Sequence, residues 1–347
     1  MSATPTAAPG TLVSEVPDGV ETERIGYAWA INHALAEEMR RDPRVWMMGQ
    51  DIGKMGGVFG VTRGLFDEFG PMRVRDTTIN ETFIVGGAAG AAMTGTIPVV
   101  ELQFADFGLV AGDEIFHKLA KWRYMHGGKL ELPAVVRLPT GVVGGAGAEH
   151  SQSLEAMGMH VPGLKVALPA TPADAKGLLK TAIHDRNPVL FFEHKGMYRM
   201  KGEVPTGDDY LVPFGVAAVR RHGDAATVVA TGLMVPRALE AAEKLSAEGI
   251  ELEVIDPRTL VPLDMETIVT SVERTGRALV VQEAVRTAGA GAEIAARIQE
   301  AVFFALDAPV WRLGALDTPV PQDPDLEQLV IPSATQIEAA ARELVAL

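Results

Sequence analysis

The chain contains no cysteine among its 347 residues. This absence excludes disulfide bonds, thiolate catalysis and cysteine-ligated zinc, and it fits a cytoplasmic enzyme. Long hydrophobic runs are also missing, since none reaches the roughly 18 residues of a membrane-spanning helix. Basic residues are outnumbered, and the net charge of −14 argues against a general affinity for nucleic acid or anionic membranes. The 47% hydrophobic and 22% charged content is typical of a soluble globular protein, long enough for two domains.

The first residues, MSATPTAAPGTLVSEVPDGV, lack the basic start and apolar core of a signal peptide. They are rich in Pro, Ala, Thr and Gly, so we expect a flexible leader over residues 1–21.

Beyond the leader, short apolar runs of strand length alternate with segments of helical period. Examples of the runs are VWMMGQDI, IPVVELQ and NPVLFFE. This alternation predicts an α/β fold, with mostly parallel sheets covered by helices on both faces. A long helix is expected over 106–125. The polar stretch 194–210 resembles a linker, so we place one α/β domain at 22–205 and a second at 206–347.

A single acid, Glu81, stands at the front of the Gly- and Ala-rich segment INETFIVGGAAGAAMTG. Thr78 and Glu81 fit the S/T-x-x-E capping box. Alternatively, Asn80 caps the helix and Glu81 occupies its first position, where the helix dipole favours a carboxylate. A third reading is a buried acid with a chemical role, because strand ends in open α/β sheets are where ligands bind.

The stretch PTGVVGGAGAEHSQS has four glycines within residues 141–147 and then His150. It is neither a P-loop nor a dinucleotide fingerprint. His150 is either an acid/base group on a loop in a cleft or an ordinary surface histidine. Phe104 and Phe107 follow a predicted strand and either pack in the core or stack on a ring cofactor. GAGAEIAAR, residues 289–297, favours close helix packing over phosphate binding.

The chain resembles one family through five motifs in matching order: INETFIVGGAAGAAMTG, ELQFADF, GAEHSQS, PGLKVALPATPADAKGLLKTAIHDRNPVLFFEHK and VIDPRTLVPLDMETI. The family is the beta subunit of the thiamine-diphosphate-dependent decarboxylating component of pyruvate, branched-chain 2-oxoacid and acetoin dehydrogenases. The resemblance covers about residues 22–345. It implies a transketolase-like pyrimidine-binding domain followed by a transketolase C-terminal-type domain.

The resemblance also implies roles for individual residues. Glu81 matches the glutamate that hydrogen-bonds the aminopyrimidine of thiamine diphosphate and helps to activate it. Phe107 matches the aromatic residue stacked on that ring, and Ile79 and Gln103 fall near the same ring. His150 matches the histidine that faces the substrate. The backbone carbonyls where family members can hold a structural potassium ion fall at Ala134, Ala182, Asp185 and Asn187.

One family feature of thiamine enzymes is absent from the chain. The Gly-Asp-Gly motif that holds Mg²⁺ and the diphosphate is missing, and Gly207-Asp208-Asp209 is no substitute. The resemblance therefore implies that an alpha subunit supplies Mg²⁺ and the diphosphate site, in an α2β2 heterotetramer. A lipoyl-bearing acyltransferase component would receive the acyl group.

The sequence leaves open the substrate and two alternative functions. The substrate is pyruvate, a branched-chain 2-oxo acid or acetoin. The chain could instead be half of a split transketolase that transfers ketol units between sugars, although GAGAEHSQS offers few basic residues for a sugar phosphate. A third alternative is a non-catalytic scaffold with the same fold.

Overall fold

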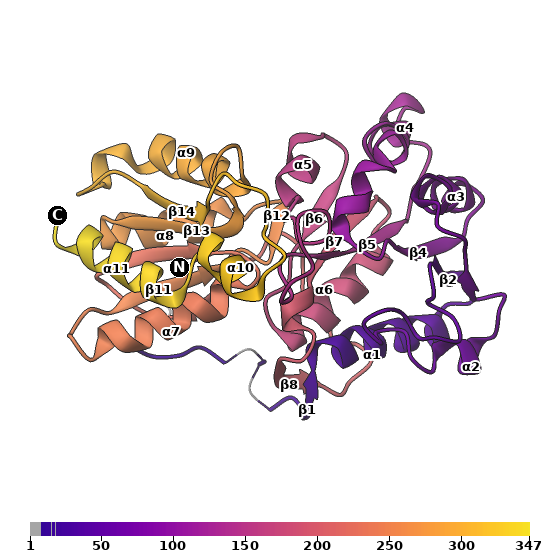
Figure 1. Cartoon of the computed structure of the whole chain (residues 1–347), viewed down its shortest axis with the longest axis horizontal. Helices are drawn as coiled ribbons and strands as arrows, with labels where there is room; N and C mark the ends of the chain where they lie inside the picture. Colours follow the sequence, from indigo (N-terminus) through magenta and orange to yellow (C-terminus); the bar gives the residue numbers. More distant parts are fainter. Residues whose placement is uncertain (1–7, 15, 18) are drawn as a thin grey trace. The chain divides into compact units, whose positions relative to one another are not determined.

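The computed structural model describes residues 8–14, 16–17 and 19–347. The described chain forms two compact units (Figure 1). The larger unit comprises residues 16–214 together with 259–262, and the smaller unit comprises residues 8–14, 215–258 and 263–347. The larger unit thus runs a little beyond the boundary expected near residue 205.

The larger unit is built on a seven-stranded sheet in the order β12-β6-β7-β5-β4-β2-β3. All neighbours are parallel except β12, which pairs antiparallel with β6. The strands are β2 (Val45–Gly49), β3 (Val74–Asp76), β4 (Ile97–Glu101), β5 (Val135–Thr140), β6 (Lys165–Ala167), β7 (Val189–His194) and β12 (Thr259–Val261). Every residue of β2, β5 and β7 is buried, as expected for strands covered on both faces.

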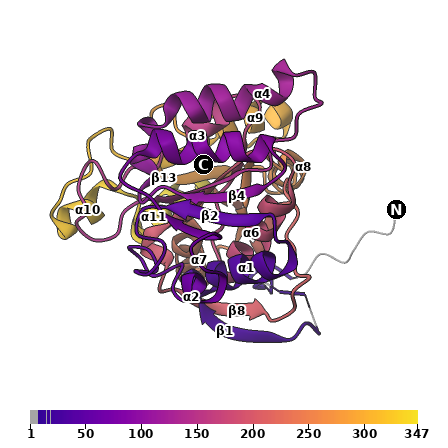
Figure 2. The same cartoon turned by 90° about the vertical axis from the view of Figure 1, so that its right-hand side faces the viewer.

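Helices cover both faces of this sheet, which confirms the predicted α/β fold. Figure 2 shows α3 and α4 on one side of β2 and β4, and α1 on the other side. The helices are α1 (Tyr27–Arg41), α2 (Leu65–Phe69), α3 (Glu81–Met93), α4 (Ala120–Met125), α5 (Glu155–His160) and α6 (Pro172–His184). Thr171 caps α6 by accepting a hydrogen bond from the Asp174 backbone N–H, with Pro172 in the first turn.

Two expectations for the larger unit are wrong. The long helix over 106–125 is divided into a 3₁₀ turn (Ala105–Leu109), a π-helical segment (Glu114–Leu119) and α4. The expected linker contains a strand, β8 (Lys201–Pro205), which pairs antiparallel with β1 (Thr22–Gly26). These two short strands, far apart in the sequence, form a separate two-stranded sheet, and KGEVP has no continuous apolar run by which the sequence could reveal it.

The smaller unit has a five-stranded sheet in the order β14-β13-β10-β11-β9, parallel except for β9. Its strands are β9 (Ala218–Arg221), β10 (Ala226–Ala230), β11 (Leu252–Asp256), β13 (Ala278–Val285) and β14 (Trp311–Ala315). Its helices are α7 (Met234–Ser246), α8 (Met265–Thr275), α9 (Ala290–Val302), α10 (Pro324–Val330) and α11 (Ala334–Val345).

Part of the expected flexible leader, residues 1–7, 15 and 18, lies outside the described residues. Within the described part, the backbone N–H of Gly10 donates to the His222 carbonyl at 2.8 Å, and that of Val13 donates to the Arg220 carbonyl at 3.0 Å. This segment therefore continues the hydrogen bonding of the smaller unit beside β9.

The glycines of GAGAEIAAR pack against a side chain, as the sequence indicates. The Gln282 side-chain carbonyl accepts a hydrogen bond from the Gly291 backbone N–H at 2.5 Å. A Cβ on Gly289 would lie 2.0 Å from Gln282 Nε2. The Gln282 side chain thus occupies the start of α9, and the Gly291 backbone N–H there is already hydrogen-bonded within the protein.

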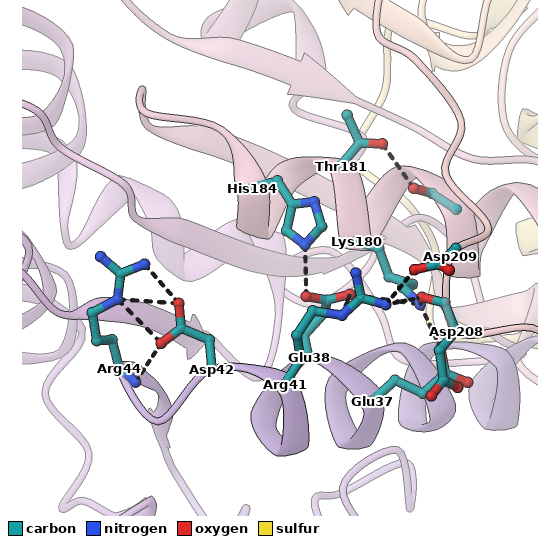
Figure 3. A network of polar contacts seen from close by, with 11 residues as sticks. Glu37, Glu38, Arg41, Asp42, Arg44, Lys180, Thr181, His184, Asp208 and Asp209 are labelled. Atoms are coloured by element: carbon teal, nitrogen blue, oxygen red, sulfur yellow. Dashed lines mark hydrogen bonds and ion pairs between the residues drawn. The ribbon is translucent and has the colours of Figure 1, made fainter.

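Helices α1 and α6 of the larger unit are joined by buried charges (Figure 3). Lys180 is fully buried and its ammonium lies 2.6 Å from one carboxylate oxygen of Glu37. Lys176, also fully buried, lies 2.7 Å from the other oxygen of Glu37. His184 contacts Glu38 at 2.7 Å. Because each ion faces an opposite charge, the pairs fix the register between the two helices.

No helix in the part of the chain that the structure describes is long and apolar enough to cross a membrane.

Candidate active site

The predicted site residues follow the carboxyl ends of neighbouring strands in the larger unit, and these strand ends form one edge of the sheet. Strands β3, β2, β4, β5 and β7 are neighbours that run in the same direction, so their carboxyl ends lie together. Glu81 follows β3, Gln103 and Phe107 follow β4, and His150 follows β5. This edge is where ligands bind in open α/β sheets.

Glu81 is the first residue of α3, and only 5% of it is exposed. Asn80 is the N-cap, because its side chain accepts a hydrogen bond from the Phe83 backbone N–H at 2.9 Å. The structure thus adopts the second capping alternative, and the capping box that starts at Thr78 is wrong. The carboxyl of Glu81 is free of any capping task and lies at the positive end of the helix dipole.

Two site residues escaped the sequence reasoning, and both directly follow β2. Gln50 is 4% exposed and donates a hydrogen bond from its side-chain amide to Glu81 Oε1 at 3.1 Å. Asp51 accepts a hydrogen bond from the Gln103 amide at 3.3 Å. Asp51 also has a φ of 56°, in the left-handed region that non-glycine residues seldom adopt. The signal available in the sequence was two polar residues immediately after a buried strand.

The aromatic residues form a cluster around His150. Its ring lies 4.6 Å from the Phe104 ring and 5.3 Å from the Phe107 ring, both edge to face. Phe104 and Phe107 are themselves 5.8 Å apart. All three side chains are half-buried. His150 is therefore not a loose surface histidine, because two aromatic rings hold its imidazole beside the strand edge.

Two buried charged side chains hold the loop that carries His150 in place. The ammonium of Lys195 donates a hydrogen bond to the His150 carbonyl and lies 4.9 Å from the centre of the Phe104 ring. Asp106 accepts hydrogen bonds from the backbone N–H of Gln152 at 3.2 Å and from its side-chain amide at 2.9 Å. Lys195 and Asp106 are both buried. They connect the loop to the 3₁₀ turn Lys195–Met197 that directly follows β7 and to the 3₁₀ turn that holds Phe107.

The glycines of this loop allow backbone conformations that other residues seldom adopt. Gly141, Gly144, Gly145 and Gly147 all have positive φ values, between 77° and 95°. A residue with a Cβ would be strained at each of these positions, so the glycines allow the tight path that leads to His150.

Ile79 and Gln103 differ from the other predicted site residues in their exposure and their contacts. Ile79 is 81% exposed, two residues before the buried Glu81. Gln103 is half-buried and its amide is bonded to Asp51. Their contact with a cofactor ring stays a prediction.

A buried ionic cluster lies directly below this edge. Arg137 of β5 is fully buried and binds Glu193 of β7 through two hydrogen bonds of 2.6 and 2.8 Å. It also donates to Glu101 at the end of β4. The Tyr198 hydroxyl donates to Glu193 at 2.9 Å. Phe59 connects this cluster to the site, because its ring lies 5.2 Å from Tyr198 and 5.9 Å from Phe104.

Burial dominates the protonation of this cluster. It raises the pKa of the Glu101 carboxyl, although Arg137 opposes the shift. It also raises the pKa of the Tyr198 hydroxyl, and Glu193 adds to that effect. Burial acts against the charge of Arg137, but Glu193 and Glu101 outweigh it and raise the pKa of the guanidinium. Arg137 therefore stays charged and holds both carboxylates.

The four residues of the expected potassium site lie near the start of β5 and the end of α6. The Ala134 carbonyl accepts a hydrogen bond from the Val189 backbone N–H at 2.9 Å, and the Ala182 carbonyl accepts one from Asp185 at 3.3 Å. The Asp185 carboxylate accepts a hydrogen bond from the Asn187 side-chain amide at 2.8 Å. Each carbonyl oxygen has a second lone pair, so a cation at these carbonyls stays a prediction. Within the described ranges, no group of three or more His, Asp or Glu side chains could hold a metal ion.

Two protein families match the chain. The transketolase pyrimidine-binding domain matches residues 23–201, and the transketolase C-terminal domain matches residues 215–337. These matches confirm the expected transketolase-like pair of domains.

The curated relatives agree with this result. The acetoin:2,6-dichlorophenolindophenol oxidoreductase subunit beta of Cupriavidus necator is 49% identical, over 90% of this chain and 95% of its own. The 2-oxoisovalerate dehydrogenase subunit beta of Bacillus subtilis is 47% identical, over 92% and 98%. The pyruvate dehydrogenase E1 component subunit beta of Rhizobium meliloti is 42% identical, over 94% and 71%.

A solved structure described as a split gene transketolase, inactive beta4 tetramer, is similar in fold. It matches with a TM-score of 0.75 and 26% identity, covering 93% of this chain and 99% of its own.

Proposed function

We propose a function from the premise that the chain belongs to the beta subunits of the thiamine-diphosphate-dependent decarboxylating component of 2-oxoacid and acetoin dehydrogenases. With an alpha subunit, it cleaves a 2-oxo acid or acetoin and passes the acyl group to the lipoyl group of an acyltransferase component. It is catalytically incomplete by itself and works in an α2β2 heterotetramer in the cytoplasm.

One observation carries this proposal: a buried carboxyl with one oxygen left for a ligand, at the ligand-binding edge of a parallel sheet. Gln50 occupies Glu81 Oε1. Glu81 Oε2 is then the oxygen that exchanges a proton with the pyrimidine nitrogen of thiamine diphosphate. The half-buried ring of Phe107 offers the flat apolar surface on which that pyrimidine would rest. The residues of this chain therefore fit the pyrimidine half of the cofactor.

When bound, thiamine diphosphate supplies the carbon nucleophile that attacks the 2-oxo group. This chain contributes proton transfer and positioning. Glu81 holds the proton shared with the ring nitrogen, as a general acid–base group. His150 offers an imidazole nitrogen to the substrate, and its work is to move a proton as the acyl group passes to the lipoyl sulfur.

The diphosphate half has no counterpart in this sequence, because the Gly-Asp-Gly motif is missing. We assign that half and its Mg²⁺ to the alpha subunit. A potassium ion at the carbonyls of Ala134, Ala182, Asp185 and Asn187 would join β5 to the end of α6.

The test is coexpression with an alpha subunit of the same enzyme family. Thiamine-dependent decarboxylation is measured with ferricyanide as the electron acceptor, over pyruvate, acetoin and 3-methyl-2-oxobutanoate. The proposal expects turnover of at least one of them, and little binding of thiamine diphosphate by the chain alone. No turnover of any of them, or tight binding without the partner, would contradict it.

A ketol transferase is the second candidate, because the similar solved structure is described as a split gene transketolase. Adding a ketose phosphate and an aldose phosphate to the same assay separates the two. Transfer between sugars without decarboxylation would favour this alternative.

A further inference from the structure

The residue before Gln50 is paired on both sides with neighbouring strands. Gly49, the last residue of β2, is in register with Asp76 of β3 and with Glu101 of β4. The backbone N–H of Thr77 donates to the Gly49 carbonyl at 2.9 Å. Gln50 therefore directly follows a residue that lies where the ends of three strands meet.

Asp51, which follows Gln50, has a strained backbone conformation held by a hydrogen bond. Asp51 holds the left-handed conformation with a φ of 56°, and the Gly57 backbone N–H donates to the Asp51 carbonyl at 2.8 Å. A non-glycine residue in this region carries a conformational cost, which is retained where the surrounding contacts require it. The tight turn at Asp51 directs the chain away from the edge and leaves Gln50 facing α3.

The contact between Gln50 and Glu81 joins two buried side chains. Gln50 is 4% exposed and Glu81 is 5% exposed, and the donor–acceptor distance is 3.1 Å. The two oxygens of a carboxylate lie in one plane, so a bond to Oε1 sets the direction of Oε2. A glutamine amide supplies this hydrogen bond without adding a second negative charge beside Glu81.

We propose that Gln50 is a positioning residue for Glu81: its amide occupies Oε1 and thereby aims Oε2 at the pyrimidine nitrogen. This inference rests on the proposed function, since the group that Oε2 meets is the cofactor ring. Gln50 itself does not contact the cofactor. It acts through the orientation of one carboxylate.

The pairing itself is tested on the chain alone, without cofactor. Gln50→Leu keeps the approximate volume but removes the donor, and we expect the melting temperature to fall by about 3 to 6 °C. Gln50→Glu places two carboxylates together and lowers it further. The exchange of partners, Gln50→Glu with Glu81→Gln, restores one amide–carboxylate bond and the melting temperature. Gln322→Leu, at an exposed glutamine, is the control and leaves the melting temperature unchanged.

The positioning role is tested on the complex with the alpha subunit. Gln50→Leu is expected to weaken thiamine diphosphate binding and to lower kcat at saturating cofactor, each by about tenfold. The KM for the 2-oxo substrate stays unchanged. A kcat that falls at saturating cofactor while the KM is unchanged separates a positioning role from a purely structural one. The exchanged pair lacks the Glu81 carboxylate, so it is used for the stability test alone.

The two proposals fail in different ways. A Gln50→Leu complex with wild-type cofactor affinity and kcat overturns the positioning role while leaving the proposed function intact. A Gln50→Leu chain with the wild-type melting temperature overturns the pairing. A wild-type complex that does not bind thiamine diphosphate overturns the proposed function, and the positioning role with it.

Discussion

The buried guanidinium of Arg137 lies between two buried carboxylates, those of Glu101 and Glu193. Arg137→Met replaces it with an uncharged, unbranched and somewhat shorter side chain. Glu193 then loses two hydrogen bonds, of 2.6 and 2.8 Å, and Glu101 loses its guanidinium donor. Neither carboxylate can turn to water, because Glu193 is fully buried and Glu101 is 4% exposed.

The expected loss is about 3 to 5 kcal/mol in the free energy of unfolding, the usual cost of removing one partner of a buried ion pair. Tyr198 cannot compensate, since its hydroxyl already donates to Glu193. Replacing the carboxylates as well, in Arg137→Met with Glu101→Gln and Glu193→Gln, removes the uncompensated charge. This triple variant should recover a large part of the loss.

The loss also depends on pH, and its direction follows from Glu101. Burial raises the folded-state pKa of Glu101 above its unfolded value, although Arg137 opposes it. Between those two values the folded chain binds more protons, so the stability from this group is present at low pH and is lost as pH rises. Removing Arg137 removes the opposing charge and steepens the decline above about pH 4.5.

Chemical denaturation followed by circular dichroism, at several pH values, measures both effects. An Arg137→Met chain as stable as the wild type, or one that gains stability between pH 5 and pH 8, would refute this reasoning.

Three further predictions concern the site and the frame that supports it. Phe107→Ala should weaken thiamine diphosphate binding by the complex by about tenfold, as measured by fluorescence quenching, and an unchanged affinity would argue against stacking. Lys180→Met should lower the free energy of unfolding by about 3 kcal/mol, whereas Lys244→Met, at an exposed pair, should cost less than about 1 kcal/mol in the same denaturation series. Gly163→Ala would bring a Cβ within 1.8 Å of the Ala120 carbonyl oxygen at a φ of 105°, so the yield of soluble protein should fall sharply; normal expression and stability would contradict that clash.

Much of the site could be predicted because its residues follow strands whose ends the sequence indicates. Glu81 follows the short strand expected at RVRDTTI, Phe107 follows a buried apolar run, and His150 follows such a run and a glycine-rich loop. The strand-end argument was made for Glu81, and the family resemblance placed Phe107 and His150 beside the same cofactor. The structure places Phe107 and His150 in ring contact and Glu81 at the same edge.

The supporting residues could not be predicted in the same way. The contact between Gln50 and Glu81 depends on β2 lying between β3 and β4, and the order of strands in a sheet is not written in local periodicity. Lys195 lay in a stretch that looked like a linker. Its bond to the His150 carbonyl depends on β7 lying beside β5. Polar residues near strand ends are common, and only the tertiary structure shows which of them support the site.

The proposed proton exchange between Glu81 and the cofactor is tested by replacing this one carboxylate. The complex of this chain with its alpha subunit is prepared as wild type and as Glu81→Gln, and thiamine-dependent decarboxylation is measured at saturating thiamine diphosphate. Size-exclusion chromatography confirms that both complexes are assembled. We expect the variant to be at least about 100-fold slower, because an amide cannot exchange the proton. A Glu81→Gln complex with wild-type turnover would contradict the account.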